Sequence, residues 1–235
     1  MFARSTTMGN AKAPTSKNGQ PVRHSRIFLP LIRPFYECKW QYNHHINMER
    51  GIICFETGEF AQRRTENEFY ALPLLQFLES ALGIPYIYRQ IATRQELEYY
   101  LNKIGEQHYH NKFGVVYFSF HGEPENICLR RNGHDNISLE DLAEMGAISE
   151  AFKDRHVHFS TCETLNCEDA IIKRFKRNVG AKSISGYTKC VDATAAYINE
   201  LAYMHQIFQY DTITTLKKHM ADYQAQLNKL GFTIY

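Results

Sequence analysis

The chain has 235 residues, 44% of them hydrophobic, and a net charge of +2. This length suits one domain with a sizeable core, and the near-balanced charge gives no reason to expect nucleic acid or an anionic membrane as a partner. No stretch approaches the roughly 18 apolar residues of a membrane span, and residues 1–20 are too polar for the core of a signal peptide. We therefore expect a cytoplasmic protein whose six cysteines are thiols, without the CxxC spacing typical of zinc sites.

The first 49 residues differ in composition from the rest of the chain. Residues 1–26 are rich in Ser, Thr, Asn, Lys and Pro, which predicts a flexible extension. Residues 27–49 are more apolar but contain two prolines, so we expect an irregular segment that packs on the core. Residues 50–235 then form the main domain.

The main domain alternates predicted strands and helices. Short β-branched and aromatic runs predict buried strands, and apolar residues at helical spacing predict helices. Thr65 with Glu68 and Thr93 with Glu96 have the form of capping boxes, and Pro73 predicts a kink or a late helix start. The expected strands are residues 51–57, 84–91, 113–120, 127–129, 156–161 and 182–186, and the expected helices are residues 65–82, 93–107, a short one from residue 138, 168–178, 192–209 and 212–230. This alternation predicts an α/β fold with a mostly parallel sheet and helices on both faces.

Two of the predicted strands end on reactive side chains. His121 and Gly122 follow the strand at residues 113–120, and Cys162 follows the apolar run that begins at His156. Functional groups of a parallel α/β sheet collect just beyond the carboxyl ends of its strands. If these two strands are neighbours, His121 and Cys162 lie side by side, as a cysteine nucleophile and its base must.

A nucleophilic cysteine needs a base, donors for the tetrahedral oxyanion and a substrate groove. His121 is the candidate base, and the backbone amides of Gly122 and Cys162 are the candidate oxyanion donors. We expect a helix to follow Cys162 closely and to lower its pKa. A cysteine at a strand end is more often a small apolar residue, but the pairing with His121 favours catalysis, and the caspase pattern also places its His about 50 residues before the Cys.

The same motifs resemble those of a known family. Phe-Ser-Phe-His-Gly at residues 118–122 and Phe-Ser-Thr-Cys-Glu-Thr at residues 159–164 are similar to the His-Gly and Ser-Ala-Cys-Glu-Thr motifs of the CHAT family, which comprises caspase-like peptidases related to separase. The segment from Tyr187 to Ala196 resembles the one that often reads Trp-Pro-Val-Asp-Asp in that family. The resemblance covers about residues 51–209, and Cys-Glu-Thr is its most specific part.

The resemblance implies a caspase-like three-layer α/β/α sandwich and a cysteine endopeptidase that acts on a protein or peptide without metal or organic cofactor. It makes His121 the base, Cys162 the nucleophile and Gly122 an oxyanion donor. Asp192 would face a basic P1 side chain, although it could equally cap the following helix. Small bacterial members are often found beside defence systems, where they cut a partner protein. The resemblance therefore implies a role in antiviral defence, and it is compatible with an activating partner protein.

For most other residues near the motifs we expect structural roles. Glu163 and Tyr187 border the expected substrate cleft, and for Glu163 we favour a structural role in its loop over a contact with substrate. His156 and His158 alternate along one strand, and we expect a solvated or packed pair rather than metal ligands. Cys167 and Cys190 are expected to be passive.

Two other functions remain open. The chain could keep the fold but lack catalysis, as a pseudo-peptidase that binds a partner in its groove. It could also be a nucleotide-responsive or phosphate-binding α/β domain, but the sequence contains neither GxGxxG nor GxxxxGK[ST]. The presence of both His121 and Cys162 favours the peptidase.

Overall fold

The computed structural model describes residues 50–58, 71–130, 135–210, 212–221, 229 and 231–235. Contacts divide the chain into residues 1–42 and residues 43–235, and the described residues all belong to the second unit. The expectations for residues 1–26 and 27–49, and the capping box at Thr65, lie outside the described residues.

Six strands form the main sheet, in the order β2-β1-β3-β7-β8-β9. They are β1 (Gly51–Thr57), β2 (Tyr86–Ile91), β3 (Phe113–Ser119), β7 (His156–Ser160), β8 (Ser183–Tyr187) and β9 (Phe232–Ile234). All neighbours are parallel except β9, which runs antiparallel to β8. The prediction of an α/β fold with a mostly parallel sheet is confirmed.

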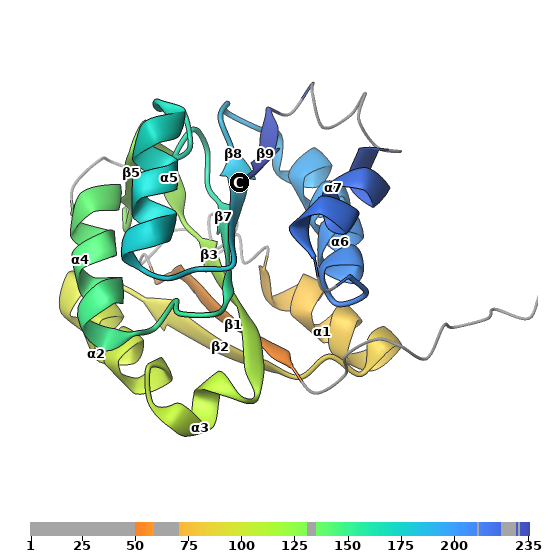
Figure 1. Ribbon diagram of the computed structural model, residues 1–235, viewed down its shortest axis with the longest axis horizontal. Helices are drawn as coiled ribbons and strands as arrows, with labels where there is room; N and C mark the ends of the chain where they lie inside the picture. Colours follow the sequence, from red (N-terminus) through yellow and green to blue (C-terminus); the bar gives the residue numbers. More distant parts are fainter. Residues whose placement is uncertain (1–49, 59–70, 131–134, 211, 222–228, 230) are drawn as a thin grey trace, which may run out of the picture. The chain divides into compact units, whose positions relative to one another are not determined.

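Helices cover both faces of this sheet, which gives three layers (Figure 1). One face carries α2 (Arg94–Ile104), α4 (Leu139–Ser149) and α5 (Asp169–Asn178), and the other carries α1 (Ala71–Leu82), α6 (Ala193–Ile207) and α7 (Ile213–Met220). A short helix, α3 (Gln107–His110), precedes β3. The predicted α/β/α sandwich is therefore present.

Alternation along the strands creates a separate apolar core on each face. In β3, Val116 and Phe118 belong to the core under α2, α4 and α5, whereas Val115 and Tyr117 belong to the core under α1, α6 and α7. Successive side chains of a strand point to opposite faces, so a strand buried on both sides reads as a continuous apolar run. This explains why β1 and β3 were recognisable from the sequence.

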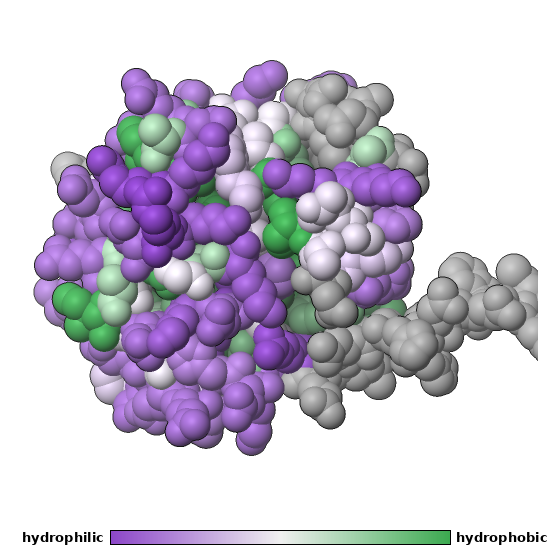
Figure 2. Space-filling model, viewed as in Figure 1, coloured by the Kyte–Doolittle hydropathy of each residue, from purple (hydrophilic) through white to green (hydrophobic). Residues whose placement is uncertain are grey.

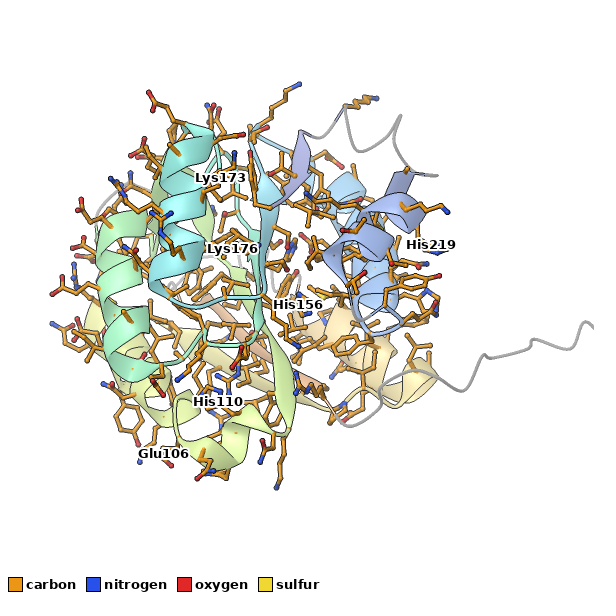
Figure 3. The ribbon with its side chains drawn as sticks, in the orientation of Figure 1. Glu106, His110, His156, Lys173, Lys176 and His219 are labelled. Carbon is orange, nitrogen blue, oxygen red and sulfur yellow. The ribbon has the colours of Figure 1, made fainter. Side chains whose placement is uncertain are left out.

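The helices turn polar side chains to solvent. Helix α5 buries Ile172 and Phe175, while Lys173 is exposed. Figure 2 shows that hydrophilic residues cover most of this face of the molecule, and Figure 3 labels Lys173 on the outside of α5. Among the described helices, none is long and apolar enough to cross a membrane.

Several helix boundaries follow the sequence signals. Thr93 and Glu96 form a full capping box at the start of α2, and the Ser138 side chain accepts a hydrogen bond from the Asp141 amide at the start of α4. Pro73 lies in α1, whose described part begins at Ala71, and the helix start expected at Thr65 lies outside the described residues. The helix expected over residues 93–107 instead ends at Ile104, and a second short helix follows.

Two features of the fold were not predicted. A small antiparallel sheet consists of β4 (His121–Glu123), β5 (Asn126–Cys128) and β6 (Asn136–Ser138), and only β5 was expected. The antiparallel edge strand β9 was also missed. β4, β6 and β9 are three residues long, which is too short for alternation to reveal them, whereas β5 lies in an apolar run that continues to Leu129.

A buried arginine joins three elements at the amino-terminal end of β3. Arg155 is 1% exposed, and its guanidinium donates hydrogen bonds to the carbonyl oxygens of Phe113, Ala151 and Ile104 at 3.1, 2.6 and 2.9 Å. Burial lowers the pKa of Arg155 to about 10. The carbonyl groups thus satisfy a cation that burial alone would penalise.

Candidate active site

The sheet register brings the two reactive loops together. β3 and β7 are adjacent and parallel, and Ser119 at the end of β3 pairs with Ser160 at the end of β7. His121 and Cys162 each follow their serine by two residues. The expectation that these two strands are neighbours is confirmed, so the histidine and cysteine segments leave the same edge of the sheet.

His121 begins strand β4, which was not expected from the sequence. It pairs with Cys128 on β5 and is partly buried. The small sheet therefore holds the backbone of the candidate base in an extended conformation.

Gly122 packs directly against the cysteine loop. A Cβ atom at this position would lie 2.2 Å from the carbonyl oxygen of Cys162 and 2.5 Å from Oγ1 of Thr164. Only a residue without a side chain allows this approach. The geometry places the proposed oxyanion donor beside the backbone of the proposed nucleophile.

A pair of threonines ties the two segments to each other. Thr161 donates a hydrogen bond to Oγ1 of Thr164 at 2.7 Å, and that hydroxyl donates to the carbonyl oxygen of Asn126 at 2.8 Å. The Glu125 amide donates in turn to the Thr164 carbonyl at 3.2 Å. These bonds join the cysteine loop to the β4–β5 hairpin that carries His121.

The environment of Cys162 differs from the one we expected. Helix α5 begins only at Asp169, so no helix end lies directly after the cysteine. Burial raises the pKa of the Cys162 thiol, while a hydrogen bond from the Val191 amide opposes this shift. The expected lowering of this pKa by a helix terminus was therefore wrong, because a turn of several residues separates the strand from the helix.

Glu163 shapes the turn after the cysteine. Its φ is 56°, in the left-handed region that residues other than glycine rarely adopt. Its amide donates to the Lys189 carbonyl at 3.3 Å, and its own carbonyl accepts from the Asn166 amide at 2.7 Å. These contacts are those of a residue that forms the loop.

The chain matches one family model, described as a family of unknown function (DUF6642), over residues 49–235. The chain belongs to this family. A search of curated proteins found no match. Among solved structures, the chain is similar to a secreted C11 cysteine protease from Bacteroides thetaiotaomicron in complex with an irreversible peptide inhibitor, with a TM-score of 0.48 and 12% sequence identity. The match covers 69% of this chain and 55% of that protease, so this chain spans about half of the protease's length.

In this DUF6642 member, Tyr187 lies in the interior and not on the surface of a cleft. Its side chain is 0% exposed, and its hydroxyl contacts Glu200 and Asn199 of α6. The Tyr187 carbonyl accepts a hydrogen bond from the Leu165 amide at 3.2 Å. The Tyr187 backbone therefore supports the cysteine loop, and its buried side chain is not accessible to a substrate.

Asp192 caps a helix, which was one of the two roles predicted for it. Its carboxylate accepts a hydrogen bond from the Ala195 amide at 3.0 Å and begins α6. Asp192 is exposed, and the backbone of its neighbour Val191 acts to lower the pKa of the Cys162 thiol against the effect of burial. Capping and proximity to the site are therefore compatible in this residue.

His156 and His158 of β7 are packed rather than solvated. Nδ1 of His156 lies 2.7 Å from Oγ of Ser183, and Nδ1 of His158 lies 2.9 Å from Oγ of Ser185. Nε2 of His158 lies 3.5 Å from a carboxylate oxygen of Glu200. Within the described ranges, no cluster of three or more His, Cys, Asp or Glu side chains could hold a metal ion.

Two buried acids and one contact between thiols were not predicted from the sequence. Glu56 at the end of β1 is 1% exposed and accepts a hydrogen bond from Ser119 at 3.0 Å, and Glu200 is 2% exposed. A charged residue that ends an apolar strand, as Glu56 does, was the available signal. The contact lies between Sγ of Cys162 and Sγ of Cys190, which are 3.6 Å apart.

Proposed function

We propose that the protein is a cysteine endopeptidase in which Cys162 is the nucleophile and His121 the base. The observation that carries this proposal is the register of β3 and β7, which sets both residues at matching positions beyond adjacent strand ends. The close approach of Gly122 to the Cys162 carbonyl supports the proposal further, because it brings the backbone of Gly122 next to the backbone of Cys162. The motif resemblance to caspase-like CHAT peptidases favours the same roles.

The proposed reaction begins from the neutral thiol. Since burial raises the pKa of Cys162, the thiol holds its proton at neutral pH until a base removes it. His121 takes this proton as the sulfur attacks the scissile carbonyl, and the amides of Gly122 and Cys162 stabilise the oxyanion. His121 then protonates the leaving amine, and water hydrolyses the acyl-enzyme.

The substrate is proposed to be a protein or peptide with a basic P1 residue bound near Asp192. The carboxylate of Asp192 is exposed and stands one residue from the amide that contacts Cys162. Glu163 adds a second acidic side chain directly after the nucleophile. An activating partner protein and a role in bacterial defence follow from the family resemblance alone and belong to the same proposal. A cytoplasmic setting belongs to it too, on the ground of the polar first 20 residues and the expected thiols.

The decisive experiment compares the purified protein with single variants on a pooled peptide library of varied P1 residues. Cys162→Ala and His121→Ala should each abolish cleavage, whereas Cys167→Ala should retain it. Cys167 is the matched control because it is another partly buried thiol on the segment between β7 and α5. Cleavage that persists in Cys162→Ala would overturn the proposal.

A second candidate function is a pseudo-peptidase that binds a partner protein. The observation in its favour is that the Cys162 thiol contacts another thiol and has a raised pKa, so it is not preactivated. Alkylation with iodoacetamide separates the two candidates. A catalytic Cys162 should react faster than Cys167 near pH 7, and His121→Ala should remove that difference. Equal rates in the wild-type protein, together with no cleavage, would favour the pseudo-peptidase.

The basic P1 preference has its own test in Asp192→Asn. Asparagine caps helices as well as aspartate, so this variant removes the charge and keeps the hydrogen bond to Ala195. We expect kcat/KM for substrates with Arg or Lys at P1 to fall at least ~10-fold, as for the loss of a desolvated charge pair. Substrates with neutral P1 residues should be unaffected. An equal change for both classes would return Asp192 to helix capping alone.

A further inference from the structure

Cys190 lies next to the candidate nucleophile, on the segment that connects β8 to α6. Its side chain is exposed, and its sulfur is 3.6 Å from the sulfur of Cys162. Sulfurs in a disulfide lie about 2.0 Å apart, so a small movement of either side chain would bring them to bonding distance. Cys54 and Cys128 are buried, and the contact between Cys162 and Cys190 is the one thiol–thiol contact that the structure records among the described cysteines.

The backbone holds the two thiols in this arrangement. The Glu163 amide donates to the Lys189 carbonyl at 3.3 Å, so the residues on either side of the thiol pair are hydrogen-bonded across the gap. The Leu165 amide donates to the Tyr187 carbonyl at 3.2 Å, which adds a second hydrogen bond between the two segments. These bonds hold the backbones of the Cys162 and Cys190 segments beside each other, so the two thiols can meet across the gap.

We propose that Cys162 and Cys190 are a modification site that a peroxide converts to a reversible disulfide. One thiol attacks the peroxide, its sulfur gains an oxygen as a sulfenic acid, and the other peroxide oxygen leaves as water or alcohol. The second thiol then attacks that sulfur, the S–S bond forms, and a water leaves. The two thiols lose two electrons to the peroxide, and a dithiol reverses the change by exchange.

The functional consequence rests on the proposed peptidase. A disulfide at Cys162 removes the nucleophile, so oxidation would switch the enzyme off and reduction would restore it. Cys190 is the resolving partner and takes no part in the chemistry on substrate. It would also protect Cys162 from further oxidation to sulfinic acid, which is irreversible in most proteins.

The test uses the full chain and hydrogen peroxide at one equivalent. The protein is alkylated and digested with trypsin without reductant. We expect most copies of the peptide of residues 156–173 to be cross-linked to the peptide of residues 190–217, and the two peptides to separate when dithiothreitol is added. The first peptide also contains Cys167, so Cys167→Ser is the matched control and should keep the cross-link. Cys190→Ser should abolish it.

The outcomes separate this inference from the peptidase proposal. Cross-linking is read by mass and needs no activity, so its absence in the wild-type protein, or its loss in Cys167→Ser, overturns the inference even if peptides are cleaved. A cross-link in a protein that cleaves nothing supports the inference and leaves the peptidase proposal to fail alone. In an active enzyme, peroxide should abolish cleavage in the wild-type protein and dithiothreitol should restore it. In Cys190→Ser, excess peroxide should carry Cys162 on to the sulfinic acid, which dithiothreitol does not reduce, so cleavage should not recover.

Discussion

Gly122 shows how a single residue sets the distance between the two reactive segments. Its Cα lies so close to the Cys162 carbonyl that a methyl group would overlap that oxygen. Cys162 and Thr164 supply the nearest atoms, and these belong to the loop whose position decides whether the Cys162 thiol can meet the proposed base.

We expect Gly122→Ala to displace the Cys162 loop. A misplacement of about 1 Å at a catalytic group can lower the rate ~100-fold, and overpacking destabilises by about 1–3 kcal/mol. Peptide cleavage and urea unfolding measure both effects. Gly114→Ala is the matched control, because its Cβ would meet only the flexible Arg50 side chain, at 3.1 Å. Equal activity in the two variants would contradict this account of Gly122.

Several helices begin at a residue whose side chain caps the helix end. The hydroxyl of Thr93 accepts a hydrogen bond from the Glu96 amide at 3.2 Å, and the Glu96 carboxylate accepts from the Thr93 amide at 3.2 Å. Both bonds satisfy amides that the helix itself leaves without partners. Such local reciprocity needs no tertiary contact.

Thr93→Ala should therefore lower the free energy of unfolding by about 1 kcal/mol. Thr93→Ser keeps the hydroxyl and should remain close to the wild-type protein. Urea unfolding at neutral pH measures both variants, and the slope of the free energy against urea should stay unchanged. A similar loss in the serine variant would mean that the threonine methyl group, and not the cap, stabilises α2.

The features that the sequence could predict depend on local contacts, and those that it could not predict depend on tertiary contacts. Thr93 and Asp192 predict the starts of their helices because capping depends on residues close in sequence. β1 and β3 are predicted by continuous apolar runs, which are typical of strands buried on both faces. Strand β9 forms by pairing with β8, which is distant in sequence. The contact of Cys190 with Cys162 also depends on hydrogen bonds between two loops that are distant in sequence. The raised pKa of Cys162 likewise depends on the turn before α5, whose length no local pattern records.

For the whole molecule, pH dependence should reflect the histidine at the start of β7 (Figure 3). Burial lowers the pKa of His156 from 6.5 to about 4, and Lys182, Arg50 and Lys176 add smaller contributions in the same direction. The folded protein therefore favours the neutral imidazole. Its contribution to stability is full above pH 6.5 and is lost as the pH falls toward 4, since the unfolded chain binds the proton first.

At pH 4.5 this group alone should cost up to about 2.5 kcal/mol relative to pH 7. His156→Asn removes the titration, so its stability should fall correspondingly less than that of the wild-type protein between these two pH values. His108→Asn makes the same substitution at an exposed position and should follow the wild-type curve more closely. Urea unfolding at both pH values provides the comparison, and parallel losses in all three proteins would refute the assignment to His156.

The order of strands also determines how the candidate site responds to partial opening of the fold. β3 and β7, which precede His121 and Cys162, each have a strand on both sides, whereas β2 and β9 form the edges. Amide protons in interior strands exchange with solvent only through openings that approach global unfolding, while edges and loop tips exchange through small local ones. The two reactive residues are thus attached to the slowest-exchanging part of the sheet. Fraying at either edge leaves their spacing intact, so the site should persist for as long as the sheet does.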